Sequence, residues 1–260
     1  TYADEIQTEE YGYGFDGIIR AGKDRLRGII NGIDYEANNP ETDKRIDVNY
    51  SADNAEAKKE NKRLLQERLG LEQRGVPMIC MISRLADQKG LDILANAMER
   101  LMQNDIQFVI LGTGEKRYED MFRYYENRWK GRFCSCIMFD DTLAQKIYAS
   151  GDMFLMPSRF EPCGLGQMFS LRYGTVPVVR KTGGLADSVE QFNGETGTGN
   201  GFLFETYDAE GILWAVGEAL KIYTDTDKWN TLVKNCMNTK LSWSDSAEKY
   251  MELYKEMLNN

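Results

Sequence analysis

The chain has 260 residues, 42% of them hydrophobic, and 41 acidic against 32 basic side chains give it a formal net charge of −9. This length and composition can bury a substantial core, which excludes a disordered chain, and the acidic excess disfavours general binding of nucleic acid. No run of about 18 apolar residues could span a membrane, and the first residues match no signal peptide. We therefore expect a cytoplasmic protein, or a plastid protein if the source is a plant or alga.

From about Pro77 the sequence alternates short apolar runs with amphipathic segments, which is typical of repeated strand and helix units. The first unit is the apolar run Met78–Ile82, followed by a predicted helix over residues 90–101. Five such units predict an α/β fold with a doubly wound parallel sheet and right-handed crossovers. The other four units pair residues 107–111 with 115–127, 133–139 with 142–150, 152–156 with 164–173, and 176–179 with 184–191.

The segments on either side of these units differ from them. The first 75 residues, with a charged helix predicted over residues 55–69, indicate a lead-in and not a complete domain. Beyond the fifth unit, a glycine-rich loop at residues 194–201 precedes a short predicted strand, Phe202–Phe204. Helices are then expected over residues 209–224, 227–237 and 244–258, and their tryptophans, Trp214, Trp229 and Trp243, are expected to pack in the core.

The chain contains no histidine. Ser-His-Asp and Cys-His mechanisms, and metal sites that need histidine, are therefore excluded within these residues, although a histidine could come from another domain. The cysteines are odd in number and lack paired CxxC spacing, so we expect buried thiols and not disulfides or zinc ligands. They are Cys80, Cys134, Cys136, Cys163 and Cys236.

Ligands bind beyond the carboxyl ends of the strands in an open parallel sheet, so the loops after the strands are the candidate site. After the first strand, Arg84 and Lys89 precede a helix start, an arrangement suited to a diphosphate but also typical of solvated surface. After the second strand, Gly112, Thr113 and Gly114 would let a backbone approach a ligand closely, or form a plain turn.

The loops after the fourth and fifth strands add a carboxylate and more cations. Glu161 lies just before a glycine-opened helix start, where it could hold sugar hydroxyls or cap the helix. Arg180 and Lys181 precede a second such start at residues 182–184. Two helix starts and four basic residues facing one crevice predict a diphosphate pocket.

Three ordered motifs then make a resemblance specific. They are PSRFEPCGLGQMFSLRYGTVPVVRKTGGLAD at residues 157–187, SRLADQKG at residues 83–90 and GIINGIDYEANNPETD at residues 28–43. Together they resemble motifs of bacterial glycogen synthases and plant-type starch synthases, and the resemblance covers nearly the whole chain. The family implies a Rossmann-like fold, the donor-binding C-terminal domain of a two-domain B-type glycosyltransferase.

The resemblance also implies how the chain is divided. Residues 1–39 correspond to the tail of the acceptor domain and the hinge, and residues 40–245 to the nucleotide-sugar-binding domain. Residues 246–260 form a helix that would cross back to the missing N-terminal acceptor domain. That missing domain carries the family's Lys-x-Gly-Gly-Leu motif and active-site histidine, so we expect this half alone to be inactive.

The function implied is retaining transfer of glucose from ADP-glucose to the non-reducing end of an α-1,4-glucan, with no cofactor and no metal. By this resemblance Arg84 and Lys89 bind the donor phosphates, and Glu161 holds the glucose hydroxyls. These three are the expected catalytic residues. The position eight residues after Glu161, where related transferases have a second Glu for the ribose, holds Phe169.

The remaining expected contacts to the donor also follow from the resemblance. Thr182, Gly183 and Gly184 match a backbone cradle for the distal phosphate, and Phe139 matches an aromatic ring against adenine. The other expected residues are Asn31 near the sugar, Gly112, Thr113 and Gly114 along the nucleotide cleft, and Cys163, Gly164 and Leu165 beside Glu161, with packing favoured over catalysis for Cys163.

Two alternatives remain open at this point. The chain could be another retaining glycosyltransferase, such as a sucrose synthase or a lipid glycosyltransferase, because these share the sheet and the phosphate pocket. It could also be a noncatalytic nucleotide-binding or glucan-binding module, because a lone donor domain cannot place an acceptor. The expected partners are a nucleotide-sugar and an α-glucan, with no nucleic acid and no membrane.

Overall fold

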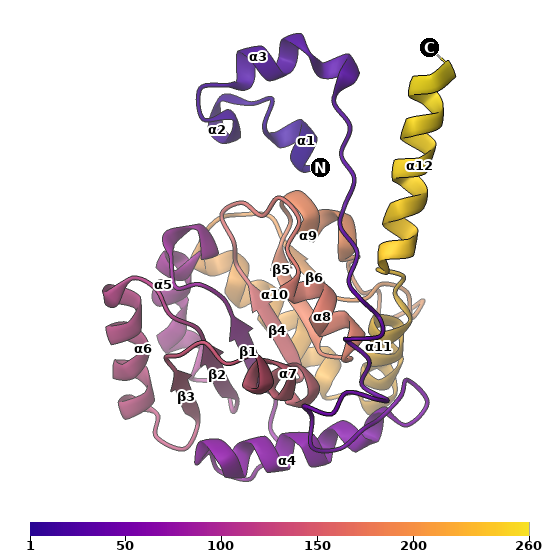
Figure 1. Cartoon of the computed structure of the whole chain (residues 1–260). Helices are drawn as coiled ribbons and strands as arrows, with labels where there is room; N and C mark the ends of the chain where they lie inside the picture. Colours follow the sequence, from indigo (N-terminus) through magenta and orange to yellow (C-terminus); the bar gives the residue numbers. More distant parts are fainter. Residues whose placement is uncertain (260) are drawn as a thin grey trace.

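The computed structural model describes residues 1–259 and contains a six-stranded, wholly parallel sheet with helices on both faces (Figure 1). The strand order is β3-β2-β1-β4-β5-β6, so the order reverses between β1 and β4. This confirms the predicted doubly wound sheet. The strands are β1 Met78–Ile82, β2 Gln107–Leu111, β3 Phe133–Cys136, β4 Met153–Met156, β5 Val176–Arg180 and β6 Phe202–Phe204.

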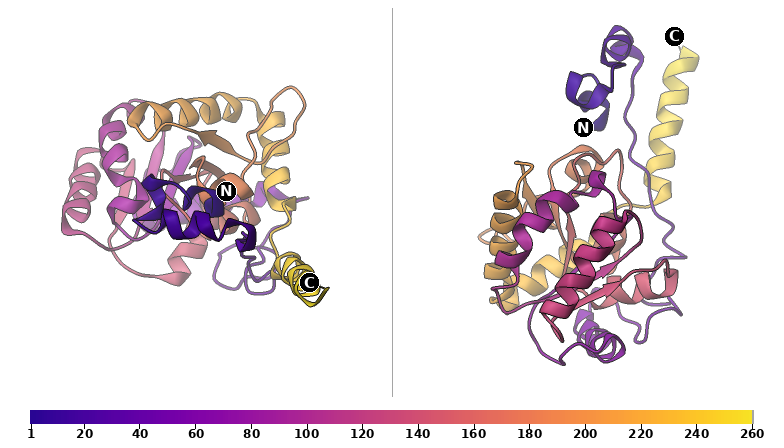
Figure 2. Two further views of the ribbon diagram at one scale, coloured as in Figure 1. Left: turned by 90° about the horizontal axis from the view of Figure 1, so that it is seen from above. Right: turned by 90° about the vertical axis from the view of Figure 1, so that its left-hand side faces the viewer.

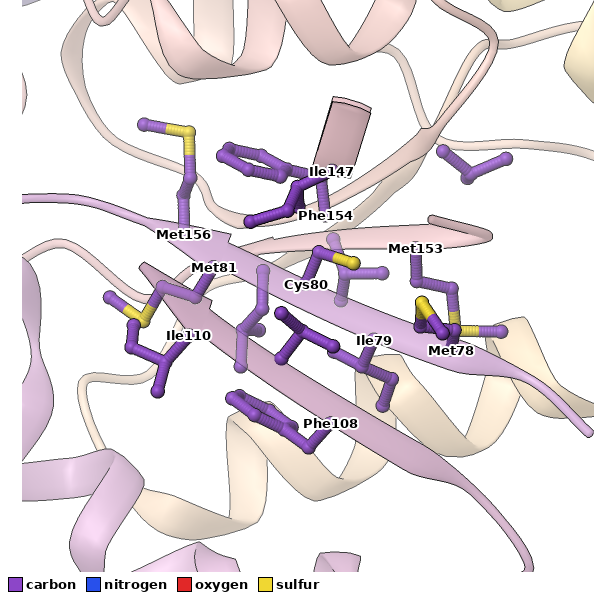
Figure 3. Packing of buried hydrophobic residues seen from close by; sticks show 14 of the residues in the cluster. Met78, Ile79, Cys80, Met81, Phe108, Ile110, Ile147, Met153, Phe154 and Met156 are labelled. Carbon is purple, nitrogen blue, oxygen red and sulfur yellow. The ribbon is translucent and has the colours of Figure 1, made fainter. Parts of the chain in front are cut away.

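The central strands are apolar along their whole length because helices cover both sides of the sheet. Met78, Ile79 and Cys80 of β1 are fully buried, as is Phe108 of β2. Figure 3 shows these side chains projecting to both sides of the strands, with Phe154 of β4 among them. The core therefore lies on both faces of β1, β2 and β4 and holds their carboxyl ends in fixed positions.

Three of the helices begin where the sequence supplies a cap. The side chains of Asp140, Asp208 and Asp225 accept hydrogen bonds from backbone N–H groups three residues later, which satisfies a donor that each helix start leaves free. The helices are α1 Tyr2–Glu5, α2 Glu9–Gly12, α3 Asp16–Ala21, α4 Lys58–Leu69, α5 Leu91–Leu101, α6 Lys116–Arg128, α7 Asp141–Ser150, α8 Gly166–Arg172, α9 Gly183–Ser188, α10 Ala209–Tyr223, α11 Thr226–Asn238 and α12 Trp243–Asn259, with single 3-10 turns at Lys23–Arg25, Ala55–Ala57 and Asp87–Lys89.

Among the element boundaries that differ from those expected, three have a clear local cause. β3 ends at Cys136, three residues early, because the chain then turns toward the Asp140 cap. α8 begins at Gly166 because Gly164 has φ of 71°, a left-handed conformation that no α-helix contains. α9 ends at Ser188 because Val189 is extended.

The prediction that all three tryptophans pack in the core is wrong for two of them. Trp229 is buried against Tyr223, whereas Trp214 is 54% and Trp243 is 49% exposed. Trp214 lies off the buried stripe of α10, which runs through Ile212, Ala215, Val216 and Ala219. Its indole therefore faces outward.

The two ends of the chain stand apart from the sheet. Figures 1 and 2 show α1 to α3 above the carboxyl ends of the strands, and α12 projecting upward beside the extended segment that follows α3. This segment and the base of α12 meet where the Ile33 N–H donates to the Leu241 carbonyl oxygen at 2.8 Å, and the Ser246 hydroxyl donates to the Ile30 carbonyl at 2.8 Å. The joint has no room for a side chain at Gly32, whose Cβ would overlap Ser242.

Two expectations about composition can be compared with the structure. All five cysteines are free, and four are buried while Cys163 is half-buried, which confirms the prediction of buried thiols over disulfides. Within residues 1–259, no helix combines the length and the apolar character needed to cross a bilayer.

Candidate functional site

The loops after β1 and β4 pack directly on each other at the point where the strand order reverses. Gly90 ends the β1 loop in a left-handed conformation with φ of 72°, and a Cβ there would overlap the Pro157 carbonyl oxygen. The N–H of Arg159 donates to the Gln88 carbonyl at 2.9 Å, which joins the two loops again. This close approach brings the side chains of the SRLADQKG and SRFEPCG segments to one place.

The central feature of the site is an ion pair between Lys89 and Glu161. Lys89 Nζ lies 2.5 Å from Glu161 Oε2, and the two side chains are only 16% and 9% exposed. The Ser158 hydroxyl also donates to Glu161 Oε2 at 3.3 Å. A carboxylate held in this way keeps its second oxygen for a ligand, and a hydroxyl group is a suitable donor to it.

A cavity of 210 Å³ lies over this pair. Its wall brings together five of the predicted site residues, and it also contains Ser83, whose buried hydroxyl has no hydrogen-bond partner among residues 1–259. An unpaired buried hydroxyl facing a cavity is a feature that a polar ligand would satisfy. The predicted residues in the wall are Arg84, Lys89, Glu161, Gly164 and Leu165.

The other three basic residues expected at the site, Arg84, Arg180 and Lys181, differ in their surroundings. Arg84 is exposed, contacts the Gln88 side chain at 3.4 Å and makes no ion pair among the described residues. Arg180 and Lys181, in contrast, do not line this cavity. Arg180 donates to the Arg159 carbonyl at 2.6 Å, and Lys181 pairs with Glu205 at 2.9 Å. The prediction of four basic residues around one crevice is therefore wrong for Arg180 and Lys181.

The start of α9 lies against the loop that carries Glu161. The N–H of Gly184 donates to the Glu161 carbonyl at 2.9 Å, while a Cβ on Gly183 would overlap that carbonyl and one on Gly184 would overlap the carbonyl of Cys163. Both glycines are thus required for the loops to meet. The predicted phosphate cradle, Thr182 to Gly184, therefore contacts the backbone of Glu161.

An acidic side chain that the motifs did not indicate already contacts this cradle. Glu5 of α1 accepts hydrogen bonds from the Thr182 hydroxyl and the Gly183 N–H, both at 2.9 Å to Oε1. Its Oε2 is buried without a partner among the described residues. The Thr1 hydroxyl donates to Asp187 Oδ1, a second contact between the first residues and α9. No sequence signal identified Glu5, because its contact depends on how α1 folds back onto α9.

The glycines after β2 have a structural role. A Cβ on Gly112 would overlap the Ser83 carbonyl, and one on Gly114 would overlap that of Leu85. Leu85 also accepts from the Glu115 N–H at 2.7 Å and donates to the Thr113 carbonyl at 2.9 Å. These residues lie at the expected edge of the sheet and fix the β1 loop, but they do not line the cavity.

Phe139 and Asn31 lie outside the cavity wall as well. Phe139 follows β3 and is 92% exposed, as a ring free to stack on a ligand would be. Asn31 comes from the segment that joins α12, and its backbone N–H contacts the Cys163 thiol. Burial raises the pKa of this thiol, so at neutral pH Cys163 is a neutral, packed group.

A parallel sheet in this order binds its ligand where the strand order reverses, and the Lys89 and Glu161 pair lies there. Residues 66–235 match the family model described as glycosyl transferases group 1, and the chain belongs to that family. It is 56% identical over 260 residues to a glycogen synthase of Kosmotoga olearia and 56% identical over 255 residues to one of Fervidobacterium nodosum. The chain spans about half the length of these relatives, 55% and 53% respectively.

Solved structures agree with this assignment. The catalytic domain of starch synthase IV from Arabidopsis thaliana, bound to ADP and acarbose, superposes with a TM-score of 0.93 at 37% identity, over 100% of this chain and 55% of that one. A sucrose-phosphate synthase from Thermosynechococcus elongatus matches with a TM-score of 0.64 at 20% identity, over 92% of this chain and 56% of that one. The second match shows the shared fold alone.

Proposed function

We propose that this chain is the donor-binding half of a retaining glucosyltransferase that transfers glucose from ADP-glucose to the non-reducing end of an α-1,4-glucan. The observation that carries the proposal is the Lys89 and Glu161 pair, with Arg84 beside it, in the cavity at the carboxyl ends of β1 and β4. The similarity to glycogen synthases and to a starch synthase bound to ADP and acarbose supports the same donor and acceptor.

Each residue has a distinct part in the proposed reaction. The free oxygen of Glu161 accepts hydrogen bonds from the glucose hydroxyls, and Lys89 and Arg84 contact the two phosphates. As the bond from glucose to phosphate breaks, negative charge builds up on the diphosphate, and these two cations stabilise it by several kcal/mol. The departing phosphate takes the proton from the acceptor 4-hydroxyl, which attacks on the same face. This scheme assigns charge stabilisation to side chains and assigns no step to a metal ion.

Phe139 and the start of α9 complete the proposed donor site. The exposed Phe139 ring stacks on the adenine, a contact that any base could make, so it gives little specificity. The Thr182 hydroxyl and the Gly183 N–H, which now hold Glu5, donate to the distal phosphate. The acceptor is placed by a further domain that corresponds to the part of the relatives outside this chain.

Calorimetric titration of the chain with ADP, UDP and ADP-glucose tests the proposal. We expect saturable binding of ADP in preference to UDP. Glu161→Gln is expected to keep ADP binding and to lose the additional affinity for ADP-glucose. Absence of binding to all three ligands would contradict the proposal, and equal affinity for ADP and UDP would contradict the assigned donor.

A further inference from the structure

A second cavity in the described part of the chain is distinct from the donor site. It is an open groove of 540 Å³ between β6 and α10, compared with 210 Å³ for the cavity over Glu161. Trp214 forms part of its wall and is 54% exposed. An exposed indole costs free energy in water, and nothing in the fold of α10 requires it, because Trp214 lies off the buried stripe of the helix.

The charges around the groove indicate what class of ligand fits it. Lys181 and Glu205 of its wall pair with each other at 2.9 Å, and Glu210 of its wall pairs with Arg100. Two cations and two anions leave the rim neutral, which favours neither a polyanion nor a polycation. All four side chains are at least half exposed, so they are free to exchange hydrogen bonds with hydroxyl groups.

The edge of the sheet beside the groove is not open to another strand. β6 is the edge strand, but the Leu203 N–H already donates to the side-chain oxygen of Gln191 at 2.9 Å. A peptide adding to this edge would find that donor occupied, so strand addition is disfavoured. The groove therefore offers a flat aromatic face and polar side chains, and no backbone ladder.

This combination suits a sugar polymer. A glucose ring presents C–H groups on its face, which pack on a large flat indole, and hydroxyls around its rim, which bond to charged and amide side chains. The groove also begins close to the donor site, because Lys181 in its wall directly precedes Thr182 of the predicted phosphate cradle. A polymer held here would be retained near the site of transfer, which raises its effective concentration.

We propose that the Trp214 groove binds a segment of α-glucan as a second carbohydrate site, separate from the site of glucosyl transfer. The identity of the polymer rests on the proposed function. The groove itself contains no residue assigned to the donor, so the two sites can be tested independently.

The test is native gel electrophoresis of the 260-residue chain through gels that contain glycogen, with dextran gels as the control. At pH 7 the net charge of −9 drives the chain through the gel, and bound polymer retards it. We expect glycogen to retard the unmodified chain more than dextran does. Trp214→Ala is expected to weaken the apparent affinity for glycogen about tenfold or more, and Trp214→Phe by a smaller factor.

Trp243→Ala is the matched control, because Trp243 is similarly exposed but lies outside the groove. It should be retarded like the unmodified chain. Every variant is also titrated with ADP, whose affinity should not change. Equal retardation of Trp214→Ala and the unmodified chain, or no retardation of either, would overturn this proposal. Loss of ADP binding by the unmodified chain would instead count against the proposed donor site.

Discussion

The carboxylate of Glu5 lies 2.9 Å from the backbone nitrogen of Gly183, so an acidic side chain from the first helix contacts the start of α9. The same oxygen accepts from the Thr182 hydroxyl. In the proposed function these two donors bind the distal phosphate of the nucleotide. An anionic ligand and Glu5 would therefore compete for one pair of donors.

Removing this competition should strengthen nucleotide binding. Glu5→Ala is expected to bind ADP about fivefold more tightly, since a typical hydrogen bond contributes about 1 kcal/mol net. Asp4→Ala is the control, because Asp4 belongs to the same short helix but is exposed. Calorimetry with ADP measures the difference. Unchanged or weaker binding by Glu5→Ala would show that the carboxylate does not occupy the phosphate position.

Arg84 and Lys89 should differ in what they contribute. Arg84 should contribute to ADP binding alone, and Lys89 to both ADP binding and the stability of the fold. Arg84→Ala is expected to weaken ADP binding about tenfold or more without changing the free energy of unfolding, because the side chain is exposed and unpaired among the described residues. Lys89→Met should weaken binding to a similar extent and also destabilise the fold, because it leaves the buried Glu161 carboxylate without its cation.

Urea unfolding of a double variant distinguishes these effects. Lys89→Met combined with Glu161→Gln removes both charges, so much of the lost free energy of unfolding should return while ADP binding stays weak. If the double variant is no more stable than Lys89→Met alone, the ion pair is not the source of the instability.

The close packing at the start of α9 gives a prediction about glycine. Gly184→Ala should destabilise the chain and abolish ADP binding, because its Cβ would overlap the Cys163 carbonyl and push α9 away from the loop of Glu161. Gly217→Ala is the matched control, since a Cβ in this part of α10 would have nothing within 4 Å. It should raise the free energy of unfolding by about 0.5–1 kcal/mol through helix propensity. Thermal unfolding and ADP titration of both variants check this pair of outcomes.

Lys58 should produce a pH dependence of stability. Its ammonium is buried and donates to three backbone carbonyls and the Thr175 hydroxyl, and burial lowers its pKa from 10.5 to about 7. Between pH 7 and 10.5 the unfolded chain therefore holds a proton that the folded chain lacks. The free energy of unfolding contributed by this group should accordingly rise with pH across that window and level off below pH 7.

Lys58→Met should remove this rise, and it should also destabilise the chain by about 1–3 kcal/mol because buried carbonyls lose their donor. Lys59→Met is the control, since Lys59 is exposed and its one ion pair among the described residues is with Glu56 at 3.9 Å. Urea unfolding at several pH values between 6 and 10 measures both effects. The same slope in Lys58→Met and the unmodified chain would assign the pH dependence to other groups.

The strands and most helices were predictable because their signals are local. Buried parallel strands are continuous apolar runs, and Asp140 and Asp208 mark helix starts in the sequence itself. The outward position of Trp214 could have been predicted from the helical period, because it falls between the buried residues of α10. The prediction that Trp214 packs in the core failed because it considered the type of residue and not its position relative to the buried face of the helix.

The site was predictable to the extent that motifs encode it. Lys89 and Glu161 were identified from their loops and their resemblance to family motifs, but their 2.5 Å contact depends on the packing of two loops 72 residues apart. Lys181 was predicted to face the diphosphate pocket, but its side chain pairs with Glu205 instead. A sequence shows that a cation follows a strand, but it does not show in which direction the side chain points. Glu5 could not be predicted, since its partners lie 177 and 178 residues away.

The joint between Ile33 and Leu241 has a mechanical consequence. Both the segment that follows α3 and the helix α12 leave the sheet domain at this one point, where a backbone hydrogen bond and the absence of a side chain at Gly32 press them together. Because both segments are attached to the sheet domain at one point, they can rotate about that point but cannot easily translate relative to the sheet. Rotation of α1 to α3 about this joint would separate Glu5 from Thr182 and Gly183, so these two hydrogen bonds oppose it.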